Sequence, residues 1–386
     1  MKKEALGKLV DIKTGKLDVN AGTEYGKYPF FTCAKTVYRI NQYAFDNEAI
    51  LVAGNGDLNV KYFKGKFNAY QRTYVIENKE VNLLSMKYLY YFMETYMIHL
   101  RNGAIGGIIK YIKIDHLTKA EIPLPPLDDQ KRIAHLLGKV ERLIAQRKQH
   151  LQQLDQLLKS VFLEMFGFFD KTYTNWTIDT LTSHTEIVSG ITKGKKYKTD
   201  ELIEVPYMRV ANVQDEHFVL DEIKTISVTK NEIKQYRLLA GDLLLTEGGD
   251  PDKLGRGAVW QNQIENCIHQ NHIFRVRVND KSRINPDYLS ALIGSPYGKS
   301  YFFRSAKQTT GIASINSTQL KKFPIVIPPI ELQNRFATIV EKVESIKTHY
   351  QQSLNNLETL YNALSQKAFK GELDLSRVAV LVDVTP

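Results

Sequence analysis

Glycine-containing loops that carry amide and basic side chains are the stretches of this sequence best suited to binding a ligand. Gly54-Asn55-Gly56-Asp57 follows one apolar run, and residues 247–257 follow another. Arg and Lys side chains read guanine, Asn and Gln read adenine, and other polar groups hold phosphates. The chain has 52 Lys and Arg residues against 42 Asp and Glu residues, a formal charge of +10. That surplus suits a polyanion such as DNA, although a modest surplus also occurs in proteins that bind nothing acidic.

We predict DNA contacts in two groups of loop residues. The first group is Asn55, Asn59, Lys61, Gln71 and Arg72, with Lys110 and Tyr111 farther along the chain. The second group is Lys193, Lys195, Lys196, Lys253, Arg256, Gln270, Asn271 and His272, with Ser314 and Asn316. For any one residue, a solvated loop position is the simpler interpretation, so the prediction concerns the groups.

Motifs for catalysis are incomplete in this sequence. An amino-methyltransferase site has the pattern Asp/Asn-Pro-Pro-aromatic, and Ser295-Pro296-Tyr297 lacks part of it. The glycine loops never read Gly-x-x-x-x-Gly-Lys-Ser/Thr, so no ATP-binding P-loop is predicted. His269 and His272 are three residues apart with only Cys267 nearby, which indicates ordinary structure and no metal site. We therefore predict no catalytic residues, no metal site and no enzyme activity in this chain.

An internal repeat sets the architecture around these loops. Shifting the sequence by 203 positions aligns residues 117–166 with 320–369 without a gap, and 16 of the 50 aligned positions are identical. About three identities would be expected by chance. Each copy opens with two prolines, Pro125-Pro126 or Pro328-Pro329, and the rest of the copy after them contains no proline. The proline pair ends the preceding element and fixes an extended backbone, and the proline-free stretch after it can then begin a new element. Each copy therefore predicts a long helix.

Apolar residues recur at heptad spacing along both predicted helices. A helix of this length spans roughly 58 Å, and such a seam requires a second helix to cover it. We therefore predict that the two helices form a coiled pair that acts as a spacer. The predicted seam consists of Ile133, Leu136, Val140, Leu143, Leu154, Leu157 and Val161 in the first copy, and Phe336, Ile339, Val343, Ile346, Leu357, Leu360 and Leu364 in the second.

The segments that flank the helices predict two mixed α/β domains. The division is 1–116 as the first domain, 117–166 as the first proline segment and helix, 167–319 as the second domain, 320–372 as the second proline segment and helix, and 373–386 as a tail. The domains echo each other weakly. We align Gln71-Arg72-Thr73 with Gln270-Asn271-His272, Tyr88-Leu89 with Tyr288-Leu289, and Gly107-Ile108-Ile109 with Gly311-Ile312-Ala313.

Composition places the chain among soluble proteins. Its two cysteines, Cys33 and Cys267, provide no disulfide framework and favour a reducing compartment. The first residues are polar, and no apolar run reaches the 18 or so residues that a membrane helix needs. We therefore expect a cytoplasmic protein that does not contact membranes.

Three stretches resemble the specificity subunits of type I restriction–modification systems. They are Ile122-Pro123-Leu124-Pro125-Pro126-Leu127 with Gln130 and Ile133, the close of the second helix from Gln366 to Leu373, and the loop from Glu247 to Gly257. The resemblance covers essentially the whole chain. One departure is Asp128-Asp129 before Gln130, where the family usually has a Glu-Gln pair.

The resemblance implies an α+β fold with two target-recognition domains, two long antiparallel helices and an internal pseudo-twofold repeat. It also implies a noncatalytic subunit that recognises an asymmetric, bipartite site in double-stranded DNA. Its partners would be two modification subunits, which methylate adenine at N6 with S-adenosylmethionine, and two restriction subunits, which use ATP and Mg²⁺. No cofactor is expected on this chain itself.

Two other classes of function are weighed against this one. A stand-alone methyltransferase or nuclease would need the catalytic motifs that are missing. A coiled-coil scaffold that binds only proteins would show neither sequence-specific DNA affinity nor salt-dependent DNA binding.

Overall fold

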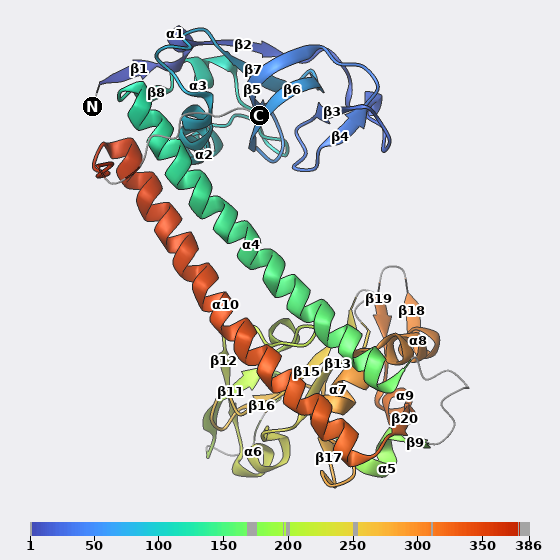
Figure 1. The fold of residues 1–386 in the computed structure, drawn as a ribbon. Coiled ribbons are helices and arrows are strands. Elements are labelled where there is room, and N and C mark those ends of the chain that lie inside the picture. The colour runs from blue at the N-terminus through green and yellow to red at the C-terminus, as the bar shows by residue number, and fades with distance from the viewer. Residues whose placement is uncertain are drawn as a thin grey trace. The chain divides into compact units, whose positions relative to one another are not determined.

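The computed structural model describes residues 2–167, 176–195, 197, 201–249, 254–309, 312–376 and 378. The chain forms two compact units, Met1–Gln149 with Gln351–Pro386, and His150–Tyr350. We call them unit 1 and unit 2. Each unit contains one domain with its own sheet and a part of each of two long helices (Figure 1).

The domain of unit 1 is built on a six-stranded sheet in the order β2-β7-β5-β6-β3-β4. Neighbouring strands are antiparallel except β3 and β6, which are parallel. The strands are β2 (Val10–Thr14), β3 (Tyr28–Phe31), β4 (Tyr38–Ile40), β5 (Phe45–Ala53), β6 (Val60–Ala69) and β7 (Thr73–Asn78). The apolar run that precedes Gly54 in the sequence forms the end of β5.

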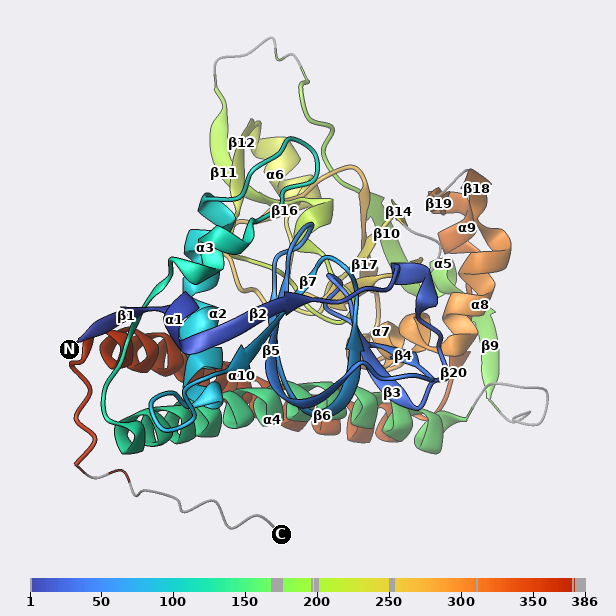
Figure 2. The ribbon, with the colours of Figure 1, turned by 90° about the horizontal axis from the view of Figure 1, so that it is seen from above.

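The central strand β5 is buried on both faces. Ile50 and Val52 belong to the core beneath α2 (Met86–Asn102), while Ala49 and Leu51 belong to a separate cluster on the other face. A strand buried on both sides reads as a continuous apolar run, which explains the sequence of β5. Figure 2 shows α2 crossing beside the sheet at β5 and β6.

Short elements tie the two ends of the first domain together. The strand β1 (Lys3–Ala5) pairs with β8 (Glu121–Pro123), directly before the first long helix. The remaining elements of unit 1 are α1 (Leu6–Leu9), the 3₁₀ segment η1 (Val19–Ala21) and α3 (Ile114–Thr118).

Unit 2 repeats this plan with a divided sheet. One sheet has the order β10-β17-β13-β15 and the other has the order β12-β11-β16. Its strands are β10 (Thr185–Ser189), β11 (Ile203–Met208), β12 (Lys224–Val228), β13 (Leu243–Thr246), β15 (Gly257–Val259), β16 (Ile268–His269) and β17 (Ile273–Val278). The long strand β6 of unit 1 thus corresponds to two short strands, β15 and β16.

Each unit contains one pair of parallel strands, at corresponding positions. Phe31 pairs with Ala69 in unit 1, and Met208 pairs with His269 in unit 2. The pairing of β1 with β8 also recurs, as β9 (Thr177–Thr180) with β20 (Pro324–Ile327).

Local sequence explains where the helices of unit 2 begin. The Asn285 side chain caps α7 (Pro286–Gly294) and the Ser295 side chain caps α8 (Pro296–Ser305), each before a proline at the first helical position. The other elements are α5 (Leu181–His184), η2 (Val210–Asn212), α6 (Lys230–Tyr236), β14 (Gly248–Gly249), β18 (Lys307–Thr309), β19 (Ile312–Ser314) and α9 (Ser317–Lys321).

The two predicted long helices are confirmed. They are α4 (Leu127–Phe166), with 40 residues, and α10 (Ile330–Lys370), with 41 residues, and each begins directly after its proline pair. In unit 1, Ile133 shares a core with Ala368, and farther along α4, Lys148 pairs with Glu358 at 2.8 Å. The helices are therefore antiparallel there.

The same holds in unit 2. Asp155 pairs with Lys347 at 2.8 Å, and farther along α4, the rings of Phe162 and Phe336 lie 5.4 Å apart. The predicted fold class, with mixed domains, antiparallel long helices and an internal repeat, is confirmed.

The predicted helix seam needs a correction at four positions. Leu143, Leu157, Ile346 and Leu360 are 41%, 46%, 43% and 45% exposed. Ile133, Val140, Phe336 and Val343 are buried, and Leu136, Leu154, Val161, Ile339, Leu357 and Leu364 are half-buried. The prediction took steps of three residues from the first seam position. The next residue along, such as Leu137 or Leu158, is the more buried one in each case, because the contact stripe follows steps of four.

Candidate nucleic-acid interface

Backbone hydrogen bonds gather several predicted DNA contacts of unit 1 at one edge of its sheet. The N–H of Gly54, directly after β5, donates to the carbonyl of Arg72 at 2.8 Å. The N–H of Gly56 donates to the carbonyl of Lys110 at 2.9 Å, and Asn55 forms a β-bridge with Tyr111. Asn55, Arg72, Lys110 and Tyr111 therefore lie on neighbouring loops, although they come from distant parts of the sequence.

Asn59 and Lys61 face the protein. The Asn59 amide donates to the carbonyls of Cys33 at 2.8 Å and Asp57 at 2.7 Å. The Lys61 ammonium donates to the carbonyl of Ala34 at 2.8 Å, and burial lowers the pKa of Lys61. Both side chains hold the loop that follows β3, which gives them a positioning role. Gln71 is exposed in the turn between β6 and β7.

Unit 2 gathers its loops with the same hydrogen bonds. The N–H of Glu247, directly after β13, donates to the carbonyl of His272 at 3.0 Å, as Gly54 does to Arg72. The N–H of Ile315 donates to the carbonyl of Glu247 at 2.9 Å, and Gly248 pairs with Ser314. Glu247 also holds the His272 imidazole, with Oε2 2.7 Å from Nδ1.

These bonds fix the alignment of the two domains and correct the predicted one. The N–H of Gln71 donates to the carbonyl of Leu17, and the N–H of Asn271 donates to that of Ile191, both at 2.9 Å. Gln71 therefore corresponds to Asn271, and Arg72 to His272, one residue away from the sequence alignment. Ile112 corresponds to Ile315 for the same reason. Each N–H donates to the carbonyl of the residue directly after a central strand, Gly54 after β5 and Glu247 after β13. The predicted alignment of Gly107-Ile108-Ile109 with Gly311-Ile312-Ala313 stays a prediction, because Gly311 lies outside the described residues. The alignment of Tyr88 with Tyr288 is confirmed: their hydroxyls donate to the carbonyls of Pro123 and Val326, each at 2.8 Å.

In each unit a glycine directly after the first strand of the sheet, β2 or β10, allows another backbone segment to approach closely. A Cβ at Gly15 would lie 1.8 Å from the Ala69 carbonyl oxygen, and a Cβ at Gly190 would lie 2.0 Å from that of His269. Neither position can accept a side chain without moving the backbone. The two glycines thus set the approach of corresponding loops in the two units.

The remaining predicted residues of unit 2 have varied surroundings. Lys193 is exposed, whereas Lys195 pairs with Glu232 at 2.6 Å. The Arg256 guanidinium donates to the Gln214 side chain at 3.1 Å, and Asn316 caps α9. Gln270 is half-buried and its N–H donates to the Met208 carbonyl. Lys196 and Lys253 lie outside the described residues.

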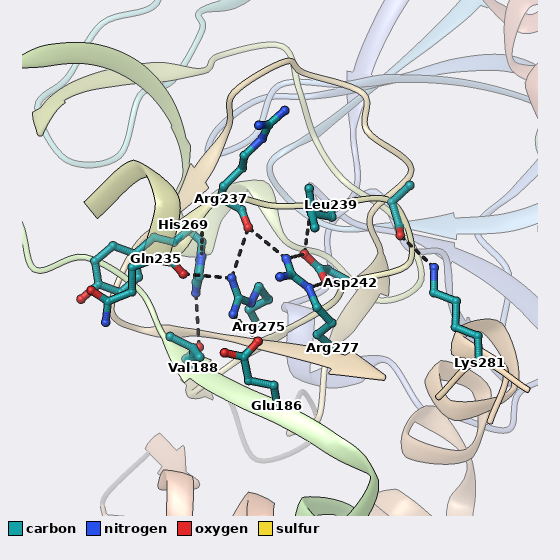
Figure 3. A network of polar contacts seen from close by, with 12 residues as sticks. Glu186, Val188, Gln235, Arg237, Leu239, Asp242, His269, Arg275, Arg277 and Lys281 are labelled. Atoms are coloured by element: carbon teal, nitrogen blue, oxygen red, sulfur yellow. Dashed lines mark hydrogen bonds and ion pairs between the residues drawn. The ribbon is translucent and has the colours of Figure 1, made fainter. Parts of the chain in front are cut away.

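A buried polar network supports the His269–His272 loop (Figure 3). Asp242, 1% exposed, accepts two hydrogen bonds from Arg277, at 2.6 and 2.7 Å. Arg275, 2% exposed, donates to Glu186 at 2.8 Å and to the carbonyls of Gln235 and Arg237. The two buried charges, those of Asp242 and Arg275, are therefore paired and hydrogen-bonded, as burial requires.

The imidazole of His269 belongs to the same network. Its Nδ1 lies 3.1 Å from the carbonyl of Tyr236 and its Nε2 lies 3.2 Å from that of Val188. Burial lowers the pKa of His269 to about 4, so at pH 7 the ring is neutral and its single N–H donates to one of these two carbonyls. His269 fixes the backbone from which Gln270, Asn271 and His272 extend, and is no metal ligand candidate. Among the described residues, no group of three or more His, Cys, Asp and Glu side chains could hold a metal ion.

The loop after the parallel strand is a part of this edge that the sequence predictions missed. In unit 1 it carries the exposed Lys35, whose ammonium lies 3.1 Å from Asp57. In unit 2 it begins with Arg209, which pairs with Glu222 at 3.3 Å. A sequence pattern could have found both, because Pro29-Phe30-Phe31 and Pro206-Tyr207-Met208 precede the two loops.

Solved structures and the family model identify the class and then the family of this chain. The S subunit of the type I restriction–modification system of M. genitalium superimposes with a TM-score of 0.62 at 17% identity, over 95% of this chain and 96% of that chain. A structure from work on complex assembly and conformational transition of the type I R-M system gives 0.55 at 16% identity, over 96% and 98%. These likenesses define the fold class as that of S subunits.

The family model for the type I restriction modification DNA specificity domain matches residues 1–156 and again 174–359. This chain therefore belongs to the type I restriction–modification specificity subunits. The specificity subunit of the type I restriction enzyme EcoDI from Escherichia coli is 29% identical, over 95% of this chain and 87% of that protein. Among the described residues, no helix is long and apolar enough to cross a membrane.

Proposed function

We propose that this chain is a noncatalytic subunit that recognises an asymmetric, bipartite site in double-stranded DNA. One observation carries the proposal. The same backbone hydrogen bonds hold different residues at corresponding positions of the two units: Arg72 against His272, and Asn55 against Gly248, which has no side chain. A common framework with different polar side chains suits two surfaces that read different base sequences. The site that they read together is then asymmetric.

The division of the chain follows from this proposal. Residues 1–116 and 167–319 would be the target-recognition domains, 117–166 and 320–372 the segments that carry the long helices, and 373–386 a tail. The helices would set the distance between the two half-sites. Adding or removing one helical residue would rotate the rest by about 100°, so their length matters.

We further propose that the chain recruits modification subunits, which methylate adenine, and restriction subunits, through its long helices. The four exposed apolar residues of the helices support this. Leu143 and Ile346 are related by the 203-residue offset, as are Leu157 and Leu360. Leu143 and Leu360 belong to unit 1, and Leu157 and Ile346 to unit 2, so each unit exposes an equivalent pair. Two equivalent apolar pairs suit two copies of one partner.

Exchange of one domain tests the proposal. Residues 167–319 would be replaced by the same segment of another specificity subunit, and the methylated motif would be read from cells that also express the modification subunit. We expect one half of the motif to change while the other half stays intact. A change in both halves, or in neither, would overturn the modular reading of DNA. A protein-only scaffold would give no motif with either chain.

A further inference from the structure

A short hairpin between α2 and α3 exposes an apolar tip. Ile105 and Tyr111 exchange two backbone hydrogen bonds, at 2.9 and 2.8 Å, and enclose Gly106-Gly107-Ile108-Ile109-Lys110. Gly106 has a φ of +113°, and a Cβ there would lie 2.6 Å from the Ile109 carbonyl oxygen. The turn therefore requires glycine at position 106.

The tip side chains have almost no cover within the chain. Ile108 is 105% exposed and Ile109 is 64% exposed, the first being among the most exposed large apolar side chains of the described residues. Lys110 and Tyr111 follow directly and are also exposed. Exposed apolar side chains grouped in this way commonly mark a surface that binds a partner.

The hairpin is fastened to the candidate DNA-reading loop. The N–H of Gly56 donates to the carbonyl of Lys110, and Asn55 is bridged to Tyr111. On the other side, the Tyr74 hydroxyl donates to the Ile112 carbonyl at 3.0 Å. The isoleucines are thus tied to the same edge of the sheet as Asn55 and Arg72, and not to a separate surface. DNA bound at this edge would meet the tip.

We propose that the hairpin of residues 105–111 is a wedge whose Ile108 and Ile109 side chains insert between neighbouring base pairs of the bound DNA. The inference rests on the proposed function. A methyltransferase must extrude its target adenine from the duplex, which costs the stacking energy of that base. Isoleucine is one of the apolar side chains that enter base steps and unstack them. Gly106 and Gly107 carry no side chain that would keep the tip out of a DNA groove. Lys110 is available for an adjacent phosphate.

The experiment uses the full chain in complex with its modification subunit and a duplex that contains the methylated motif. 2-Aminopurine, which fluoresces more strongly when unstacked, is placed at successive positions through both half-sites. The test variant is Ile108→Ala with Ile109→Ala. The control is Ile98→Ala in α2, since Ile98 is 62% exposed but lies outside the hairpin. Thermal unfolding of all three proteins verifies that they fold alike.

Extrusion of the target adenine should raise fluorescence once in each half-site. With the unchanged chain and with the Ile98→Ala control, we expect one further rise, at the step that the hairpin enters. The double variant should lose that further rise and bind the motif about tenfold more weakly, because apolar burial is lost. Specific binding without the further rise, or an equal further rise with the double variant, overturns the wedge while leaving the proposed function intact. An intact further rise combined with weaker modification-subunit binding would assign the tip to a protein contact and also overturn it. Absence of motif-specific binding by the unchanged complex overturns the proposed function and the wedge together.

Discussion

Gln130 and Gln333, separated by 203 residues, make the same three hydrogen bonds. The Gln130 oxygen accepts from the N–H of Ser85 at 2.9 Å, and its amide donates to the carbonyls of Leu83 and Pro125. The Gln333 oxygen accepts from the N–H of Asn285 at 2.9 Å, and its amide donates to the carbonyls of Arg283 and Pro328. Both side chains are 0% exposed. Each glutamine fastens the first turn of a long helix to the domain of its own unit.

Loss of either glutamine should destabilise its unit. Gln130→Ala and Gln333→Ala each remove three hydrogen bonds to largely part-buried backbone groups, at a cost of about 2–3 kcal/mol in the free energy of unfolding. Urea unfolding measures the loss. Gln152→Ala is the matched control, because Gln152 lies on α4 but is exposed. A loss as small as that of the control would show that these hydrogen bonds do not hold the helices.

Corresponding loop residues should affect different half-sites. Arg72→Ala should relax base preference at one position of one half-site, and His272→Ala should do so in the other, with losses of about 1–3 kcal/mol in binding. Binding to a panel of duplexes with single base changes measures this. Lys87→Ala, at an exposed site on α2, should leave the preferences unchanged. If both variants altered the same half-site, the two units would not read separate parts of the target.

Stability should fall as the pH drops below 7 because of His269. Its pKa is lowered by burial from the usual value of 6.5 to about 4, so the unfolded chain binds a proton first as the pH falls. The neutral ring therefore contributes stability above pH 6.5, and this is lost progressively between 6.5 and 4, amounting to about 2 kcal/mol between pH 7 and 5.

Urea unfolding at several pH values isolates this effect when the chain is compared with His269→Gln, which keeps an amide but does not titrate. The variant should lose about 2 kcal/mol less over the same pH interval. Parallel pH profiles for the two proteins would exclude His269 as the source of the dependence.

The exposed apolar pairs on the long helices should bind the modification subunits. Leu143→Ser with Leu360→Ser should weaken one partner site, and Leu157→Ser with Ile346→Ser the other, each by about 2 kcal/mol or more. Native mass spectrometry should then show complexes with one modification subunit in place of two. Val81→Ser, at a 68% exposed position outside both long helices, is the control. Full occupancy in both double variants would assign recruitment to another surface.

The long helices and the repeat could be predicted because proline pairs and heptads are local patterns. The side of each helix that faces its partner could not, since steps of three and of four residues both fit a heptad. Leu136 and Leu137 are both apolar, and only packing decides that Leu137 is the buried one.

The candidate interface could be predicted only in part. Asn55 and Arg72 follow strands and carry polar side chains, so sequence found both. Their proximity depends on pairing between segments far apart in the chain, which no local pattern encodes. Lys61 is a residue type that commonly contacts DNA, yet its ammonium donates a hydrogen bond to the Ala34 carbonyl. The one-residue shift between Arg72 and His272 likewise emerged only from matching backbone hydrogen bonds.

Single-molecule methylation sequencing tests the central claim most directly. DNA would be read from cells that express this chain with its modification subunit, and from cells that express the modification subunit alone. We predict N6-methyladenine in one asymmetric, bipartite motif, present only with this chain. A soluble, associated pair of subunits that produces no motif, or a motif that is palindromic and continuous, would contradict the account.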